Sequence, residues 1–285
     1  MIPLRQALDD ATARLAGAGV PSPRADAELL AGHVLVLGRG EVLARALAGA
    51  LIDQPDAVAF SDLVDRRASR VPLQHLTGVA YFRELTLSVG PGVFVPRPET
   101  EAVAQLAIDA LLAVPGPEPV AVDLGTGSGA IALALATEVP HARVLAVEVS
   151  PDAFVWAKLN ARSAGAENLT LVHDDLAGAL PELDGAVDVV VSNPPYIPSG
   201  AIPRDPEVRL HDPELALYGG EDGLDVVRAL DATARRLLRP GGALVIEHGE
   251  RQGEAIAGLL RASGWRAVAT HPDLLGRPRA TTAVR

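Results

Sequence analysis

Apolar residues in the first 70 positions recur at the spacing of α-helices. The pattern predicts one helix at the N-terminus, a second from Ser22 to Leu37 and a third from Pro55 to Arg70. The second begins with a Ser-Pro pair, which suits the cap and the first turn of a helix. The first carries its apolar residues on one face: Leu4, Leu8, Ala11 and Leu15. We therefore expect residues 1–70 to form a small helical domain.

The pattern changes to alternation after Val71. Residues 81–89 are rich in strand formers, Gly-Pro-Gly at 90–92 can turn, and residues 93–95 can return as a second strand. We predict a β-hairpin here and treat residues 71–97 as a linker between two domains.

Strands and helices alternate along the rest of the chain, residues 98–285. The predicted strands span 120–124, 143–148, 169–173, 187–192 and 243–247, and a final pair is expected in the last 20 residues. The predicted helices span 98–112, 129–138, 151–164, 222–238 and 251–262. Apolar strands that alternate with helices imply a parallel sheet covered on both faces. The expected fold class is therefore α/β, with a doubly wound, mostly parallel sheet behind a small all-α domain and a hairpin linker.

The charge distribution argues against a nucleic-acid partner. The formal charge is −11; residues 1–70 hold 8 Arg and 9 acidic residues, a net of −1, which leaves −10 for the remainder. Neither part has the basic surplus that phosphate backbones require, so no direct nucleic-acid binding is expected.

Composition also bears on metal chemistry and location. The chain has no cysteine and its seven histidines are scattered singly, so we expect no metal site. No apolar run reaches about 18 residues, and the N-terminus lacks a signal-peptide layout. These features predict a cytoplasmic protein without a membrane span.

A glycine-rich turn between a predicted strand and a predicted helix indicates a nucleotide-type ligand. The sequence VDLGTGSGAIALALA (122–136) ends a strand at Leu124 and continues into a helix. Gly125 and Gly127 let the backbone adopt conformations closed to other residues and approach a ligand closely. Glu148, at the end of the next strand, can accept hydrogen bonds from both hydroxyls of a ribose. Dinucleotide enzymes and methyltransferases share this arrangement, so it predicts an adenosine-containing ligand and leaves the cofactor open.

The segment SNPPYIP (192–198) comes directly after the strand predicted at 187–192. In a doubly wound sheet the ligand crevice opens where the strand order reverses, outside the carboxyl ends of the strands. That geometry would bring Asn193 beside the glycine-rich turn. Asn-Pro-Pro is also an ordinary way to leave a strand, but that role does not explain the aromatic Tyr196 at a strand end facing a nucleotide site. The pattern favours a functional role for the segment.

Asn-Pro-Pro-Tyr (193–196) resembles the motif of methyltransferases that act on planar nitrogens, namely adenine N6 and glutamine N5. Further segments resemble the release factor glutamine methyltransferases, the HemK-type enzymes of bacteria: SPRADAELL (22–30), PLQHLTGVAYF (72–82), VFVPRPETE (93–101) and IEHG (246–249). The resemblance covers nearly the whole chain. It implies methyl transfer from S-adenosyl-L-methionine, which leaves S-adenosyl-L-homocysteine, to the glutamine of the Gly-Gly-Gln motif in peptide chain release factors, modulating translation termination.

The resemblance also implies a set of site residues, within a class I methyltransferase domain at 98–285 and beside a helical domain that docks the substrate. The implied catalytic residues are Asn193, Pro194, Pro195 and Tyr196. The implied cofactor-binding residues are Asp123, Gly125, Thr126, Gly127, Ser128, Gly129, Glu148, Asp175, Leu176, Asn193, Phe94 and Arg97, with Pro98, Glu99 and Thr100 walling the site. Leu176 stands where some relatives place an aromatic residue near the adenine, and Asp212 stands where glutamate is common.

Other functions stay open at this point. An adenine-N6 methyltransferase shares the motif at 193–196, but the acidic balance and the lack of a basic recognition region oppose it. A nicotinamide-dependent oxidoreductase explains the glycine-rich turn and leaves Tyr196 without a purpose. A non-enzymatic adaptor predicts a degraded site, whereas Glu148 and Asn193 are both present. Residues 197–223 are too long for a plain connection, and we interpret them as a substrate lid rather than a flexible insertion.

Overall fold

The apolar faces of the N-terminal helices meet in one core. The helices are α1 (Leu4–Gly17), α2 (Pro23–Leu35), α3 (Arg39–Leu47), α4 (Gln54–Ala68) and α5 (Leu73–Thr77). Leu8 and Leu15 from α1, Leu30 from α2 and Phe60 and Val64 from α4 are buried together. Two short strands, β1 (Ile2–Pro3) and β2 (Leu51–Ile52), pair antiparallel beside them. The three predicted helices are confirmed.

The hydrophobic pattern does not predict α3. Gly38 and Gly40 lie at its start, and glycine disfavours a helix interior by about 1 kcal/mol relative to alanine. The Glu41 side chain offsets this by accepting a hydrogen bond from the Gly38 N–H at 3.0 Å, which satisfies one of the free donors at the helix start.

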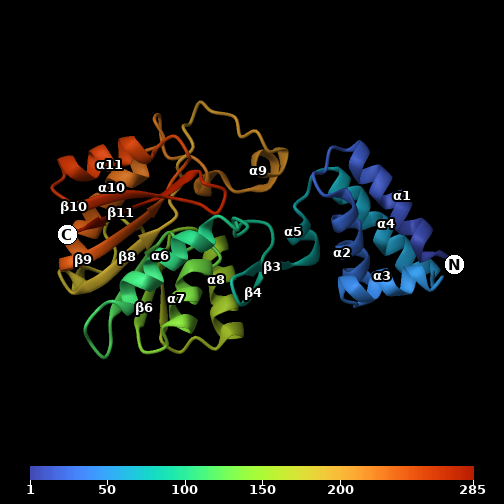
Figure 1. Ribbon diagram of the computed structural model, residues 1–285, viewed down its shortest axis with the longest axis horizontal. Coiled ribbons are helices and arrows are strands. Elements are labelled where there is room, and N and C mark those ends of the chain that lie inside the picture. The colour runs from blue at the N-terminus through green and yellow to red at the C-terminus, as the bar shows by residue number, and fades with distance from the viewer. The chain divides into compact units, whose positions relative to one another are not determined.

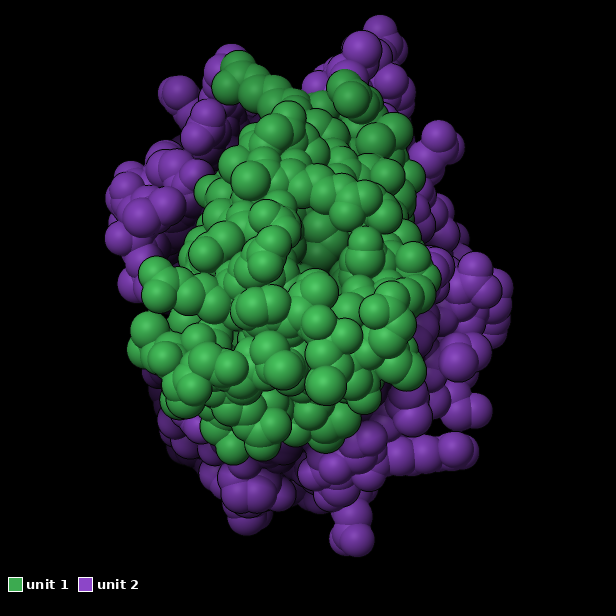
Figure 2. All heavy atoms as spheres, turned by 90° about the vertical axis from the view of Figure 1, so that its right-hand side faces the viewer, with its two compact units in different colours: residues 1–79, 203–211 green, residues 80–202, 212–285 purple.

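The computed structural model describes residues 1–285 and separates them into two units, coloured in Figure 2. Unit 1 contains residues 1–79 and 203–211, and unit 2 contains residues 80–202 and 212–285. The chain therefore leaves unit 2 after the Asn-Pro-Pro-Tyr segment, contributes nine residues to unit 1 and returns. The domain boundaries expected from the sequence, after residues 70 and 97, do not include this return of residues 203–211 to unit 1.

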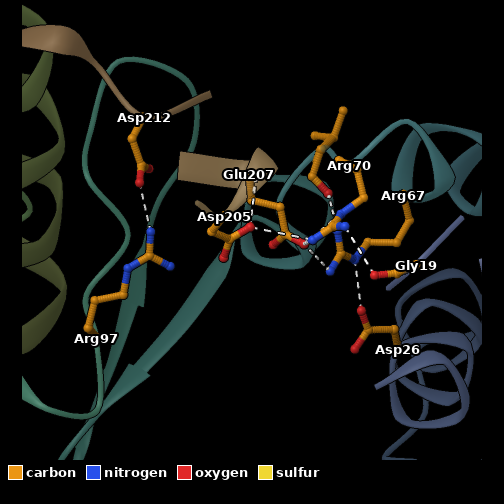
Figure 3. A network of polar contacts seen from close by, with 9 residues as sticks. Gly19, Asp26, Arg67, Arg70, Arg97, Asp205, Glu207 and Asp212 are labelled. Carbon is orange, nitrogen blue, oxygen red and sulfur yellow. Dashed lines mark hydrogen bonds and ion pairs between the residues drawn. The ribbon is translucent and has the colours of Figure 1, made fainter. Parts of the chain in front are cut away.

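Buried ion pairs hold the excursion within unit 1 (Figure 3). Arg67 of α4 is 4% exposed and donates to Asp26 and to Glu207, each at 2.7 Å. Glu207 lies in the short helix α9 (Pro206–His211) and also accepts from Arg70 at 2.9 Å. Arg70 further contacts Asp205 at 3.4 Å. These contacts join residues about 140 positions apart in sequence, which no local pattern can show.

Unit 2 is built on a seven-stranded sheet. Its strands are β5 (Val120–Leu124), β6 (Arg143–Glu148), β7 (Leu169–His173), β8 (Val187–Ser192), β9 (Leu238–Glu247), β10 (Arg266–Pro272) and β11 (Pro278–Val284). They lie in the order β10-β11-β9-β8-β5-β6-β7, parallel from β9 to β7 and antiparallel at β10 and β11. This confirms the predicted fold class, including the final pair of strands.

Helices cover both faces of the sheet (Figure 1). One face packs against α6 (Thr100–Leu112), α7 (Ala130–Glu138) and α8 (Pro151–Ala164), and the other against α10 (Asp225–Leu237) and α11 (Gly253–Ala262). Alternate residues of each strand face opposite layers, as Val144 and Leu145 of β6 show. None of the helices is both long and apolar enough to cross a membrane.

The predicted hairpin is displaced. The observed strands are β3 (Val79–Phe82) and β4 (Leu85–Ser88), so the turn lies at Arg83 and not at Gly-Pro-Gly. Arg83 takes a left-handed conformation, φ +51°, and its N–H donates to the Glu101 side chain at 3.0 Å. The prediction of a strand at 93–95 is wrong, because β3 already pairs with β4 and residues 93–95 belong to no strand. Val93 and Val95 pack instead into a small cluster beside Trp156.

We predict that Arg67→Ala lowers the free energy of unfolding by about 3–5 kcal/mol, because it leaves the buried Asp26 carboxylate without its cation. Arg14→Ala is the control: it breaks the exposed pair with Asp65 and should cost at most about 1 kcal/mol. Urea unfolding of the full chain measures both. Equal losses in the two variants would contradict the structural role given to Arg67.

Candidate functional site

The glycine-rich turn joins β5 to α7 at the carboxyl edge of the sheet. Gly125 and Gly127 have φ values of +77° and +60°, which residues with a side chain rarely adopt. A Cβ atom at either position would meet nothing within 4 Å, so this surface of the turn is open. The Gly125 and Thr126 N–H groups both donate to the Val147 carbonyl, at 2.9 and 3.0 Å. The turn is therefore anchored to β6 on one side and open on the other.

Asp123 braces the turn from beneath. Its side chain is 1% exposed, and Oδ2 accepts the Thr126 hydroxyl at 2.6 Å and the Ala132 N–H at 3.2 Å. Oδ1 has no hydrogen-bond partner within the protein. Burial raises the pKa of this carboxyl to about 7, against the lowering by these hydrogen bonds. A buried carboxylate with a free oxygen is a suitable acceptor for a cationic ligand group.

Glu148 lies at the end of β6, next to the same turn. Its Oε2 accepts the Gly127 N–H and its Oε1 accepts the Ser150 N–H, both at 2.8 Å. Each carboxylate oxygen can accept more than one hydrogen bond, so both keep capacity for a diol. The backbone contacts orient the carboxylate toward the turn.

Two of the predicted cofactor residues, Asp175 and Leu176, follow β7. Asp175 is exposed and its Oδ1 accepts the Ala177 N–H at 2.9 Å, whereas Leu176 is half-buried against the sheet. The preceding Asp174 N–H donates to the Glu148 carbonyl at 3.1 Å, which places this segment next to the end of β6.

Arg97 and Phe94 precede α6. The guanidinium carbon of Arg97 lies 4.8 Å from the centroid of the Phe94 ring, a cation–π contact. Arg97 also donates to Oδ2 of Asp212 at 2.7 Å (Figure 3). Asp212 therefore pairs with a predicted site residue at the point where the chain re-enters unit 2.

The Asn-Pro-Pro-Tyr segment emerges from β8 beside the turn. The Ser192 hydroxyl donates to the Leu124 carbonyl at 2.6 Å and so ties the end of β8 to the end of β5. Asn193 is half-buried, and its Nδ2 donates to the Thr100 hydroxyl at 3.4 Å. Burial raises the pKa of Tyr196, and the charge of Glu247 raises it further. Tyr196 itself is half-buried.

The backbone after Asn193 is fixed by residues that the sequence reading missed. Gln252 donates from Nε2 to the Tyr196 carbonyl at 2.9 Å. A Cβ atom at Gly223, where φ is +77°, would lie 2.4 Å from the same carbonyl. Within the predicted lid, the Gly219 N–H donates to the Ile197 carbonyl at 2.9 Å. The clustered glycines at 219–223 were the only available sequence signal for this packing.

We predict that Asp123→Asn gains stability relative to the wild type as the pH rises from about 4 to about 7. The carboxyl titrates near 3.8 when unfolded and at about 7 when folded. Its contribution to stability is therefore present below pH ~4 and lost as pH rises through ~7, and asparagine does not titrate. Urea unfolding of both proteins across this interval checks the trend. A difference that stays constant with pH would show that Asp123 titrates normally.

Comparison with known proteins bears on the domains and the fold. Residues 6–78 match the family model described as PrmC N-terminal domain, and residues 84–204 match the methyltransferase small domain. Two solved structures share the fold: a methyltransferase from Pyrococcus furiosus, with TM-score 0.51 and 21% identity over 71% of this chain and 89% of that one, and the hMettl16 catalytic domain, with TM-score 0.56 and 18% identity over 78% and 81%.

Relatives with higher identity span the whole chain. The release factor glutamine methyltransferase of Streptomyces coelicolor is 54% identical over 96% of this chain and 95% of its own length. The protein of the same name from Mycolicibacterium smegmatis is 49% identical over 100% and 99%. A relative from Streptomyces pristinaespiralis, a 4-amino-L-phenylalanine/4-methylamino-L-phenylalanine methyltransferase, is 45% identical over 94% and 91%. The chain belongs to the release factor glutamine methyltransferase family.

Proposed function

We propose that this protein transfers a methyl group from S-adenosyl-L-methionine to the side-chain amide nitrogen of the glutamine in the Gly-Gly-Gln motif of peptide chain release factors, and so modulates translation termination. The observation that carries the proposal is the position of Asn193 to Tyr196 at the reversal point of a methyltransferase sheet. Relatives named for this reaction at 54% and 49% identity support it. Because release factors act on the ribosome, we expect the reaction in the cytoplasm.

The residues of the turn fit S-adenosyl-L-methionine. The open backbone at Gly125 and Gly127 leaves space for close approach of a ligand. Thr126 and Ser128 belong to the same turn. The free oxygen of Asp123 suits the ammonium of the methionine part, and Glu148 suits the ribose hydroxyls. We also assign Phe94, Arg97, Asp175 and Leu176 to the walls of this site. When bound, the cofactor supplies a methyl group on a positively charged sulfur.

The chain's own task is to position the acceptor nitrogen. An amide nitrogen is a poor nucleophile because its lone pair is delocalised into the carbonyl. Asn193 Oδ1 and the Pro194 carbonyl can each accept one N–H of the substrate amide, and the ring constraint of Pro194 and Pro195 limits backbone movement. Tyr196 can stack on the amide plane. Two fixed acceptors orient the nitrogen, and orientation of this kind lowers a barrier substantially.

A small aromatic amine is the second candidate substrate. The relative from Streptomyces pristinaespiralis is named for the methylation of 4-amino-L-phenylalanine, and it is 45% identical to this chain. An amino group on an aromatic ring is also a planar nitrogen with two N–H donors, so the same acceptors can hold it. The two substrates differ in what surrounds the nitrogen.

Methyl transfer tests the proposal. The protein is incubated with cofactor labelled in the methyl group and with either a release factor fragment bearing the Gly-Gly-Gln loop or 4-amino-L-phenylalanine. We expect transfer to the fragment and not to the amino acid. Transfer to the amino acid alone would replace the proposed substrate, and transfer to a fragment carrying Gly-Gly-Ala would exclude glutamine as the acceptor.

Asn193→Ala should depress turnover by about 10²–10³-fold, the usual effect of losing one preorganised polar contact. The contact acts mainly on the transition state, so kcat and kcat/KM should fall together and far more than cofactor affinity. Tyr196→Phe should be mild if the ring only stacks, and Tyr196→Ala should be severe. Steady-state kinetics on the fragment and calorimetry with S-adenosyl-L-homocysteine measure these effects. Near-normal turnover in Asn193→Ala would mean that the amide is held elsewhere.

We also propose that unit 1 docks the protein substrate. Its separate core and its near-neutral residues 1–70, with a net charge of −1, suit a protein-binding module. If so, the full chain should methylate an intact release factor with a much higher kcat/KM than a short peptide containing Gly-Gly-Gln. Similar kcat/KM values for the two substrates would mean that unit 1 does not contribute to binding and that the substrate is recognised only by residues around Asn193.

A further inference from the structure

Glu247 lies beside Asn193 at the carboxyl edge of the sheet. The parallel strands β8 and β9 pair Ser192 with Ile246. The residues that follow these two in the chain, Asn193 and Glu247, are therefore neighbours. On its other side Glu247 pairs with Ala280 of β11. Its side chain is only 2% exposed. Apart from its effect on the pKa of Tyr196, this carboxylate has no role in the site described above, although it borders Asn193.

The contacts of Glu247 set the orientation of the Asn193 side chain. The side chains of Thr100 and Asn193 lie near enough to its carboxylate to act as hydrogen-bond donors, and this lowers the pKa of Glu247. Thr100 in turn accepts from Asn193 Nδ2 at 3.4 Å. An ionised carboxylate can only accept hydrogen bonds, so it must face the NH2 group of Asn193 and not the oxygen. Oδ1 of Asn193 is therefore turned away from Glu247.

The placement of this carboxylate is costly. Its Oε2 has no hydrogen-bond partner within the protein. Burial raises the pKa of Glu247 to about 7, although the hydrogen bonds of Thr100 and Asn193 and the charge of Arg279 lower it. A buried carboxylate with an unsatisfied oxygen destabilises a fold. The presence of Glu247 is therefore not explained by stability, whereas a role in orienting Asn193 would explain it.

We propose that Glu247 is a positioning residue, whose carboxylate holds the amide of Asn193 in the orientation that presents Oδ1 to the substrate nitrogen. The inference rests on the proposed function of Asn193 as an acceptor for the substrate amide. Glu247 acts through Asn193 and touches no reacting atom in this scheme.

The same contacts predict a dependence on pH. When Glu247 is protonated, its O–H can donate to Asn193 Oδ1 and turn the amide around, which removes the acceptor from the substrate. The other ionisable groups that face Glu247 are Glu99 before α6, Arg279 on β11 and Tyr196 after β8. Arginine and tyrosine keep their protonation near neutral pH, so the charge of Glu247 should govern the orientation there. The kcat should rise as the pH passes through about 7.

Glu247→Gln is the first test. Glutamine has the same shape but presents either an oxygen or an NH2 group, so the orientation of Asn193 is no longer fixed. We expect kcat to fall by about 10- to 100-fold, the cost that losing an orienting partner has at metal-binding side chains. Cofactor affinity should be unchanged and the rise through pH ~7 should be absent. Glu247→Asp, which keeps the carboxylate, should retain that rise. Asp188→Asn is the matched control, because Asp188 is also a buried acid but lies at the opposite end of β8; its kcat and pH profile should match the wild type.

A double-mutant cycle separates positioning from general damage. If Glu247 acts through Asn193, then Glu247→Gln should change kcat by less than about 2-fold in a chain that already carries Asn193→Ala. If Glu247 had only a structural role, the fold losses in kcat from the two substitutions would multiply in the double variant. The proposal would be overturned if Glu247→Gln lowered kcat equally in the wild type and in Asn193→Ala. It would also be overturned if the pH profile of Glu247→Gln matched that of the wild type.

Nuclear magnetic resonance provides a readout that needs no substrate. The side-chain NH2 signals of Asn193, assigned by their loss in Asn193→Ala, should shift with pH through about 7 in the wild type and stay constant in Glu247→Gln. A wild type that transfers no methyl group to the fragment would refute the proposed function, while this titration would still test Glu247. Signals that do not titrate in the wild type would refute the contact itself.

Discussion

The parallel pairing of β8 between β5 and β9 is the interaction on which the site depends. The pairing of Asp123 with Val191 and of Ser192 with Ile246 brings the ends of three strands to one edge of the sheet. Strand order reverses at β5 and β8, so the connections from these strands cover opposite faces and leave the edge between them accessible. The glycine-rich turn, the Asn-Pro-Pro-Tyr segment and the Glu247 carboxylate all follow from this register.

Buried charge marks the functional edge of unit 2. Asp123 and Glu247 are both almost fully buried, each keeps an oxygen without a partner, and burial raises the pKa of each to about 7. Burying such groups opposes folding, and the large apolar layers on either face of the sheet supply the stability that tolerates them. In our account the first carboxylate faces the cofactor and the second orients the acceptor for the substrate.

Most of the local structure of unit 2 can be predicted from the sequence, because apolar strands and capped helices depend on short-range patterns. The strands at 120–124, 143–148, 169–173 and 187–192 have the predicted bounds. The hairpin was displaced because a left-handed Arg83, held by Glu101, makes the turn in place of the glycines. The contacts of Glu207 with Arg67 and Arg70 depend on tertiary structure, and so does the approach of Glu247 to Asn193. Spacing along the chain carries no signal for either.

We propose that the site holds the amide of one glutamine for methylation. Peptide mass mapping of an intact release factor, after incubation with this protein and S-adenosyl-L-methionine labelled in the methyl group, would identify the residue that is methylated. We expect one labelled methyl group on the side chain of the Gly-Gly-Gln glutamine, and none when Asn193→Ala replaces the wild type under the same brief incubation. A label on any other residue, or an equal label with Asn193→Ala, would contradict it.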